Sequence, residues 1–128
     1  MIDYSEMSDF EINKKVATLW LPCDYYFNEN TVDLVNYGTY LGPHGVPDER
    51  LEKYGEFDPC NNASDAWMII VENGISLVKE NHEEWYCCNE LDLNSGFDVD
   101  NLKYDKNPLR AAMIVFLMMK DKDHDRKK

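Results

Sequence analysis

The sequence predicts one α+β domain in which three helices cover a small antiparallel sheet, in the order α-β-β-α-β-β-α. Three segments repeat apolar residues at helical spacing and start with capping residues, whereas the segments between them are rich in aromatic and β-branched residues. A chain of 128 residues matches the usual size of one domain with one hydrophobic core. The domain is predicted to span residues 1–119, and the charged tail at residues 120–128 is predicted to fray.

The first helix is predicted from Ser8 to Trp20. Ser8 and Glu11 have the spacing of a capping box, in which each side chain accepts a hydrogen bond from the other's backbone N–H. The expected buried face consists of Ile12, Val16, Leu19 and Trp20, and the residues expected to point away are Asn13, Lys14 and Lys15.

A β-hairpin is predicted within residues 23–40, where the turn-forming run 28–30 separates two stretches of aromatic and β-branched residues. Residues 38–55 are predicted to form a long connection rich in Gly and Pro, in which residues 48–54 could form a single helical turn. Connections of this length are often binding loops or lids. His44, Tyr40 and Tyr54 are therefore candidate ligand contacts, although an exposed loop histidine and packing tyrosines are the plainer interpretations.

The central helix is predicted between Asp58 and Gly74. Asn61, Asn62 and Ser64 are candidates to cap its start, and Gly74 stands where a left-handed C-terminal cap is needed. Its apolar stripe, with Trp67 as the largest member expected in the core, consists of Ala66, Trp67, Ile70 and Val71.

Two further strands are predicted at Ile75–Lys79 and Trp85–Cys88. The acidic segment Asn89–Asp105 resembles a calcium loop, but an EF-hand also needs a Gly at position six, a Glu at position twelve and flanking helices in register. A solvated strand and turn is the preferred interpretation. The last helix is predicted to start at Asn107–Pro108, and it is apolar around much of its circumference, which indicates burial along most of its length.

Composition restricts the possible functions. The formal net charge of −12 repels the nucleic-acid backbone and attracts basic surfaces, so general DNA or RNA binding is not expected. The sequence has no membrane-length apolar run and starts with an acidic, polar stretch, so a cytoplasmic protein is expected. No metal-ligand spacing links the cysteines, which are expected to be free thiols: Cys23, Cys60, Cys87 and Cys88.

A candidate anion site is predicted where the second and third helices start, because helix N-termini offer free N–H donors. Arg110, Asn61 and Asn62 would contribute to it. Arg110 stands in a first helical turn, where the dipole disfavours a cation, so it should either grip an anionic ligand or pair with Asp65 or Asp58. No catalytic residue, metal ion or cofactor is predicted.

Three sequence runs resemble a known family. Met7-Ser8-Asp9-Phe10-Glu11-Ile12-Asn13, Cys60-Asn61-Asn62-Ala63-Ser64-Asp65-Ala66-Trp67 and Asn107-Pro108-Leu109-Arg110-Ala111-Ala112 resemble the NinX-type proteins of lambdoid phages and, more distantly, the phage α-β-α (ABA) sandwich domain. Met68 stands where that pattern would have a Pro. The resemblance covers most of the chain and implies a phage origin, a cytoplasmic setting and an accessory role, with no established catalytic residues.

Two functions are compatible with these observations. The first is a phage accessory protein that binds and neutralises a host factor, which would include a counter-defence role. Its partner would be a protein with a basic surface or a small nucleotide-like anionic signal, and self-association stays open. The second is a small enzyme that acts on a phosphate-containing molecule with His44 and the aspartates. The first is preferred because no nucleophile, base and orienting group occur together in a recognisable pattern.

Overall fold

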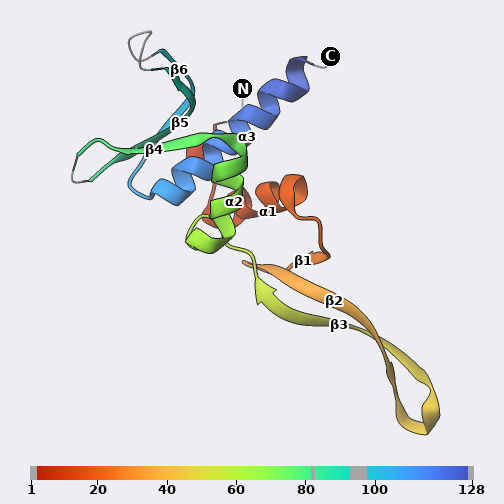
Figure 1. Ribbon diagram of the computed structural model, residues 1–128. Coiled ribbons are helices and arrows are strands. Elements are labelled where there is room, and N and C mark those ends of the chain that lie inside the picture. Colours follow the sequence, from red (N-terminus) through yellow and green to blue (C-terminus); the bar gives the residue numbers. More distant parts are fainter. Residues whose placement is uncertain (1–2, 82, 93–97, 127–128) are drawn as a thin grey trace.

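The computed structural model describes residues 3–81, 83–92 and 98–126 (Figure 1). It confirms the predicted α+β class, and its strands form two three-stranded antiparallel sheets in place of one. The helices are α1 (Asp9–Trp20), α2 (Ala63–Asn73) and α3 (Pro108–Arg126), with short 3-10 turns η1 (Tyr4–Glu6) and η2 (Pro43–Gly45). The first sheet consists of β1 (Tyr25–Phe27), β2 (Val32–Leu41) and β3 (Pro47–Glu56), and the second of β4 (Ile75–Lys79), β5 (Trp85–Asp92) and β6 (Asp98–Asp105).

Helix α3 is the centre of the hydrophobic core. Every residue from Ala111 to Leu117 is buried, as its nearly continuous apolar surface predicts. The helix contacts α1, α2 and all three strands of the second sheet. Trp20 of α1 meets Phe116 edge-on, with the ring centroids 6.2 Å apart. The core therefore forms around α3, and the other elements pack on its sides.

The C-terminal part of α3 is longer than predicted. The helix continues to Arg126, past Lys120, where the charge pattern predicts fraying. Tyr4 in η1 donates a hydrogen bond from its hydroxyl group to the carboxylate of Asp121. This contact ties the start of the chain to the C-terminal part of α3. None of the helices that the structure describes has the length and apolar character needed to cross a membrane.

The helix ends follow the local sequence signals. Ser8, Asn62 and Asn107 each accept a hydrogen bond from a backbone N–H in the first turn of α1, α2 and α3, at 3.1, 3.0 and 3.0 Å respectively. Gly74 ends α2 in the left-handed conformation, with φ of 64°. These caps satisfy N–H groups that a helix cannot satisfy internally, and they confirm the predicted boundaries.

The predicted long connection at residues 38–55 is wrong. Strands β2 and β3 pair across nearly their whole lengths and form a long hairpin that projects from the body of the protein (Figure 1). Residues 48–54, predicted as a helical turn, belong to β3. Much of this hairpin has solvent on both faces, so β3 does not need the apolar alternation by which a half-buried strand is recognised.

Helix α2 is rotated relative to its prediction. Ala66 and Ile70 are buried as expected, but Ile69 completes the buried face, and Val71 is exposed. Trp67 is 62% exposed, so its predicted role in the core is wrong. Two apolar stripes run along this helix, and periodicity alone does not decide which of them faces the core.

We expect that exchanging these two large side chains for alanine has very different effects on stability. Trp67→Ala should change the free energy of unfolding by less than about 1 kcal/mol, because the side chain has little burial to lose. Ile69→Ala should cost about 2–5 kcal/mol through lost burial and a residual cavity. Urea unfolding measures both changes. A loss at Trp67 as large as that at Ile69 would show that the tryptophan supports the core.

The cysteines differ in accessibility. All four are free thiols, as predicted, and Cys60, Cys87 and Cys88 are buried while Cys23 is exposed. Burial raises the pKa of the Cys87 thiol to about 12 and raises the pKa of Cys60 and Cys88 as well. A thiol must ionise before it reacts as a nucleophile, so the buried sulfurs should be inert in the folded protein.

Iodoacetamide should therefore modify the native protein at Cys23 alone. After denaturation in urea without a reductant, all four cysteines should react. Intact-protein mass spectrometry counts the adducts, and peptide mapping locates them. Labelling of Cys60 in the native protein at the rate of Cys23 would show that its site opens readily.

Candidate functional site

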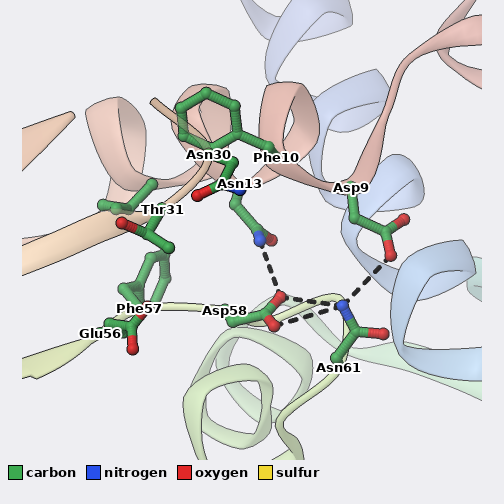
Figure 2. A pocket seen from close by; sticks show the side chains of 10 residues that line it. Asp9, Phe10, Asn13, Asn30, Thr31, Glu56, Phe57, Asp58 and Asn61 are labelled. Atoms are coloured by element: carbon green, nitrogen blue, oxygen red, sulfur yellow. Dashed lines mark hydrogen bonds between the residues drawn. The ribbon is translucent and has the colours of Figure 1, made fainter. Parts of the chain in front are cut away.

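The loop between β3 and α2 brings the starts of the three helices together. Asp58 in this loop accepts a hydrogen bond from the Asn13 amide of α1 at 2.7 Å (Figure 2). Its backbone N–H donates to the Asp65 carboxylate in the first turn of α2 at 2.9 Å. The Asn61 amide donates to both Asp58 and Asp9, and the contact to Asp9 measures 3.1 Å (Figure 2). One short loop thus joins the first turns of α1 and α2.

The peptide groups of Cys60 connect this loop to α3. The Cys60 N–H donates to the side-chain oxygen of Asn13 at 3.2 Å. The Cys60 carbonyl accepts from the side-chain amide of Asn107 at 2.7 Å. Asn107 also caps α3 with its side-chain oxygen. The two amide side chains therefore satisfy a buried peptide that would otherwise lose its hydrogen bonds to water.

The guanidinium group of Arg110 lies at the centre of these contacts. Its Nη1 donates to Asp9 at 2.6 Å, its Nε to Asp105 at 3.2 Å, and its Nη2 to the carbonyl of Met7 at 2.7 Å and that of Ser5 at 3.4 Å. The Arg110 side chain is only 14% exposed. Its donors therefore have partners within the protein on all three nitrogens, which favours the structural interpretation of this residue.

The partners of Arg110 differ from those that the sequence suggested. The sequence suggested Asp58 or Asp65 as the ion-pair partner of Arg110. In the structure, the Asp65 carboxylate instead accepts a hydrogen bond from the backbone N–H of Asp58. The ion pairs are instead made with Asp9 and Asp105, which lie 101 and 5 residues away in sequence.

The residues connected by these hydrogen bonds and ion pairs form one network, which we call the helix-start cluster. Its members are Asp9, Asn13, Asp58, Cys60, Asn61, Asp65, Asp105, Asn107 and Arg110.

The other residues predicted at the site lie elsewhere. Asn62 is near the cluster, where it caps α2. His44 lies at the tip of the β2–β3 hairpin with φ of 64°, and Tyr54 is exposed on β3. Tyr40 is in β2 opposite Asp48, and its side chain falls outside the described residues. The predicted set is therefore divided between the helix starts and the hairpin, and these residues do not form one pocket.

A pocket of about 150 Å³ lies beside the cluster, between the start of α1, the turn after β1 and the end of β3 (Figure 2). This volume is below the range of about 300–1,000 Å³ that is usual for small-molecule sites. Carboxylate and amide groups dominate its wall, which suits a small cation or hydrogen-bond donor better than a phosphate. Its lining residues are Asp9, Phe10, Asn13, Asn30, Thr31, Val32, Glu56, Phe57, Asp58 and Asn61.

The chemistry available near this pocket is limited. The Cys60 thiol is buried, and burial raises its pKa, so it is not activated as a nucleophile. Across residues 3–81, 83–92 and 98–126, no group of three or more His, Cys, Asp or Glu residues could hold a metal ion. Residues 93–97 of the acidic segment considered for calcium lie outside the described residues.

Sequence reasoning missed the role of Asn13. This residue was expected to point away from the body, yet it is buried and contacts both Asp58 and Cys60. A signal was present, because Asn13 stands three and four residues before the buried Val16 and Ala17. A polar residue within an apolar stripe indicates a buried hydrogen-bonded group when the helix is known to pack on a loop.

We expect Arg110→Gln to lower the free energy of unfolding by about 2–3 kcal/mol, because Asp9 and Asp105 would keep their charges and lose their partner. Arg110→Lys keeps the charge but cannot reproduce the forked contacts, so it should recover only part of the loss. Lys15→Gln, which removes an exposed charge from α1, is the control and should change stability by less than about 0.5 kcal/mol. Denaturant unfolding at neutral pH measures all three. Wild-type stability of Arg110→Gln would show that the guanidinium is free for a ligand.

Each of the three sequence runs that resemble NinX-type proteins contributes residues to the helix-start cluster. These are Asp9 and Asn13 from the first run, Cys60, Asn61 and Asp65 from the second, and Asn107 and Arg110 from the third. The family model described as bacteriophage P22 NinX matches residues 3–120, which include the whole cluster. No curated protein and no solved structure matches this chain. The match covers most of the chain and includes the elements that pack around α3. The chain therefore belongs to the bacteriophage P22 NinX family.

Proposed function

We propose that this protein is a phage accessory protein that binds and neutralises a host protein with a basic surface, in the cytoplasm of the infected cell. Such an activity would include a counter-defence role. The outer face of α2, formed by Trp67, Met68 and Val71, is the proposed contact. The exposure of Trp67 is the observation that carries this proposal.

The outer face of α2 has the composition of a binding surface. Trp67, Met68 and Val71 are all exposed, and they lie within two helical turns. Tryptophan is enriched among the residues that dominate binding energy at protein interfaces, and grouped apolar side chains on a surface commonly mark such interfaces. The mostly exposed side chain of Trp67 contributes little to the stability of the fold, so a contact with another molecule would explain why a tryptophan stands at this position.

The charge around α2 favours a basic partner. Residues 54–78 contain four acidic residues and no Lys or Arg. The net charge of the whole chain, −12, has the same sign. A negative surface around an apolar centre accelerates association with a positive one and repels nucleic acid.

The two other functions considered have less support. A nucleotide-like signal would need free cationic donors, whereas the donors of Arg110 have partners within the protein and the adjacent pocket is lined by carboxylates. An enzyme that uses His44 would need a base near its reacting group, but this residue lies on the hairpin, away from the aspartates of the helix-start cluster (Figure 1). A protein partner is therefore the function that we propose.

Site-specific photocrosslinking in host cells tests this proposal. A photoreactive residue at Met68 should crosslink to a basic host protein, whereas the same residue at Leu19, an equally exposed position on α1, should not. With the identified protein purified, Trp67→Ala should weaken binding by about tenfold or more, as expected for an interface hot spot, while thermal stability stays close to that of the wild type.

Raising the salt concentration should weaken this complex, because screening reduces attraction between opposite charges. Equal crosslinking of the same protein from Met68 and Leu19 would contradict the proposed contact. Unchanged affinity of the Trp67→Ala variant for the purified partner would contradict it as well.

A further inference from the structure

The outer edge of β2 is open along most of the strand. Strand β1 pairs with β2 only from Val32 to Leu34, and the last contact on this side is the Val35 N–H, which donates to the Asp24 carbonyl at 3.2 Å. Within the described part of the chain, residues 36–41 pair with β3 alone, in the hairpin that projects from the body (Figure 1). The outer side of these residues therefore has no strand beside it.

The orientation of Val35 determines which backbone groups lie on the open edge. The N–H and C=O of one strand residue point to the same side, and the sides alternate along the strand. Because the Val35 N–H points to the β1 side, the backbone groups of Tyr37, Thr39 and Leu41 point to that side as well, beyond the end of the β1 pairing. Gly42 agrees with this alternation, since its N–H points the other way and donates across the hairpin to the Val46 carbonyl at 2.8 Å. The open edge therefore presents a row of donors and acceptors to which a further strand can pair.

The two edges of this hairpin differ in composition. Open sheet edges are usually protected from further pairing by charged residues or by proline. Strand β3 has this protection, with Pro47 and six charged residues among its ten. Residues 35–41 of β2, Val-Asn-Tyr-Gly-Thr-Tyr-Leu, contain neither a charged residue nor a proline. They are also rich in residues that favour strands, so β2 is the edge that can accept another strand.

The charge around this edge favours a basic segment. Strand β3, which lies beside β2, contains four acidic and two basic residues, and Asp24 is exposed where the β1 pairing ends. The side chains of an added strand would lie about 10 Å from those of β3, which is comparable with the Debye length of about 8 Å at physiological ionic strength. The whole chain has a net charge of −12, so a second copy would be repelled, whereas a segment that contains Lys or Arg would be attracted.

We propose that an extended basic segment of a protein partner pairs with residues 35–41 of β2 as an additional strand, on the side opposite β3. The N–H and C=O groups of Tyr37, Thr39 and Leu41 then bond to the backbone of this segment. In recognition by strand addition these main-chain hydrogen bonds provide affinity, so a large buried area is not required. The Lys or Arg side chains of the segment lie near the acidic residues of β3 and near Asp24. This contact does not depend on the proposed host-protein contact at α2.

A synthetic peptide tests the backbone pairing. The probe is a fluorescein-labelled peptide of about nine residues that alternates Thr and Lys, and fluorescence anisotropy with the full chain measures its dissociation constant. Methylating the backbone nitrogens in its central part removes N–H donors but keeps every charge, so this change should weaken binding by about tenfold or more. Replacing each Lys with Glu should abolish binding. Equal affinity for the methylated peptide, or a dissociation constant above about 1 mM for the unmethylated one, would overturn the proposal.

Two matched substitutions locate the contact. Tyr37 and Leu51 are directly opposite each other and both are exposed, so Tyr37→Lys and Leu51→Lys add the same charge one strand apart. Tyr37→Lys places this charge beside the bound peptide and should raise its dissociation constant by about tenfold or more, whereas Leu51→Lys should leave it within about threefold of the wild type. Trp67→Ala should leave peptide binding unchanged, so failure of this contact and failure of the α2 contact are distinguishable. Equal effects of the two lysine substitutions would overturn the proposal.

Amide hydrogen exchange tests which backbone groups are covered. With the peptide bound, the N–H groups of Tyr37, Thr39 and Leu41 should exchange about tenfold more slowly or less, while those of Asn36 and Gly38, which point to β3, should change little. Without the peptide, sedimentation velocity should show a monomer at about 300 μM protein. Formation of a dimer that Tyr37→Lys abolishes would assign the edge to a second copy and overturn the proposal.

Discussion

The partly buried ion pair between Arg110 and Asp9 is the interaction on which the arrangement of the helices depends. It joins the first turn of α3 to the first turn of α1 across 101 residues of sequence. A cation in a first helical turn opposes the helix dipole, and a nearly buried guanidinium loses most of its hydration. Asp9, Asp105 and two backbone carbonyls offset both costs. Removing any one partner therefore leaves a charged group or a carbonyl without a hydrogen bond that it makes in the folded protein.

The amide side chains extend this interaction through the rest of the helix-start cluster. Asn107 caps α3 with its oxygen and binds the Cys60 carbonyl with its nitrogen, so one side chain performs two structural roles. Asn13 likewise binds Asp58 through its nitrogen and the Cys60 N–H through its oxygen. Because each amide uses both its donor and its acceptor, replacing either with an apolar or a charged side chain would leave a partner unsatisfied. Such double use fixes the relative positions of the helices more tightly than capping alone.

Local signals predicted the helix ends, whereas features set by packing were predicted poorly. Asn62, Gly74 and Asn107 act on backbone groups within a few residues, so their roles can be inferred from sequence. The outward orientation of Trp67 depends on which stripe of α2 meets α3, and the partners of Arg110 depend on how the chain returns after 101 residues. The β2–β3 hairpin was missed because a strand with solvent on both faces leaves no alternating pattern to detect.

The placement of the polar and apolar residues separates what holds this fold together from what it offers to other molecules. The helix-start cluster uses its charged and amide groups on one another, and among the described residues no buried side-chain nitrogen or oxygen lacks a partner. The exposed aromatic side chains, such as Trp67 on α2 and Tyr37 on β2, make no comparable contribution to the core. Trp67 lies in an acidic segment, residues 54–78, that contains no Lys or Arg. An exposed apolar side chain in acidic surroundings is suited to a partner with a basic surface, which is the contact that we propose for α2.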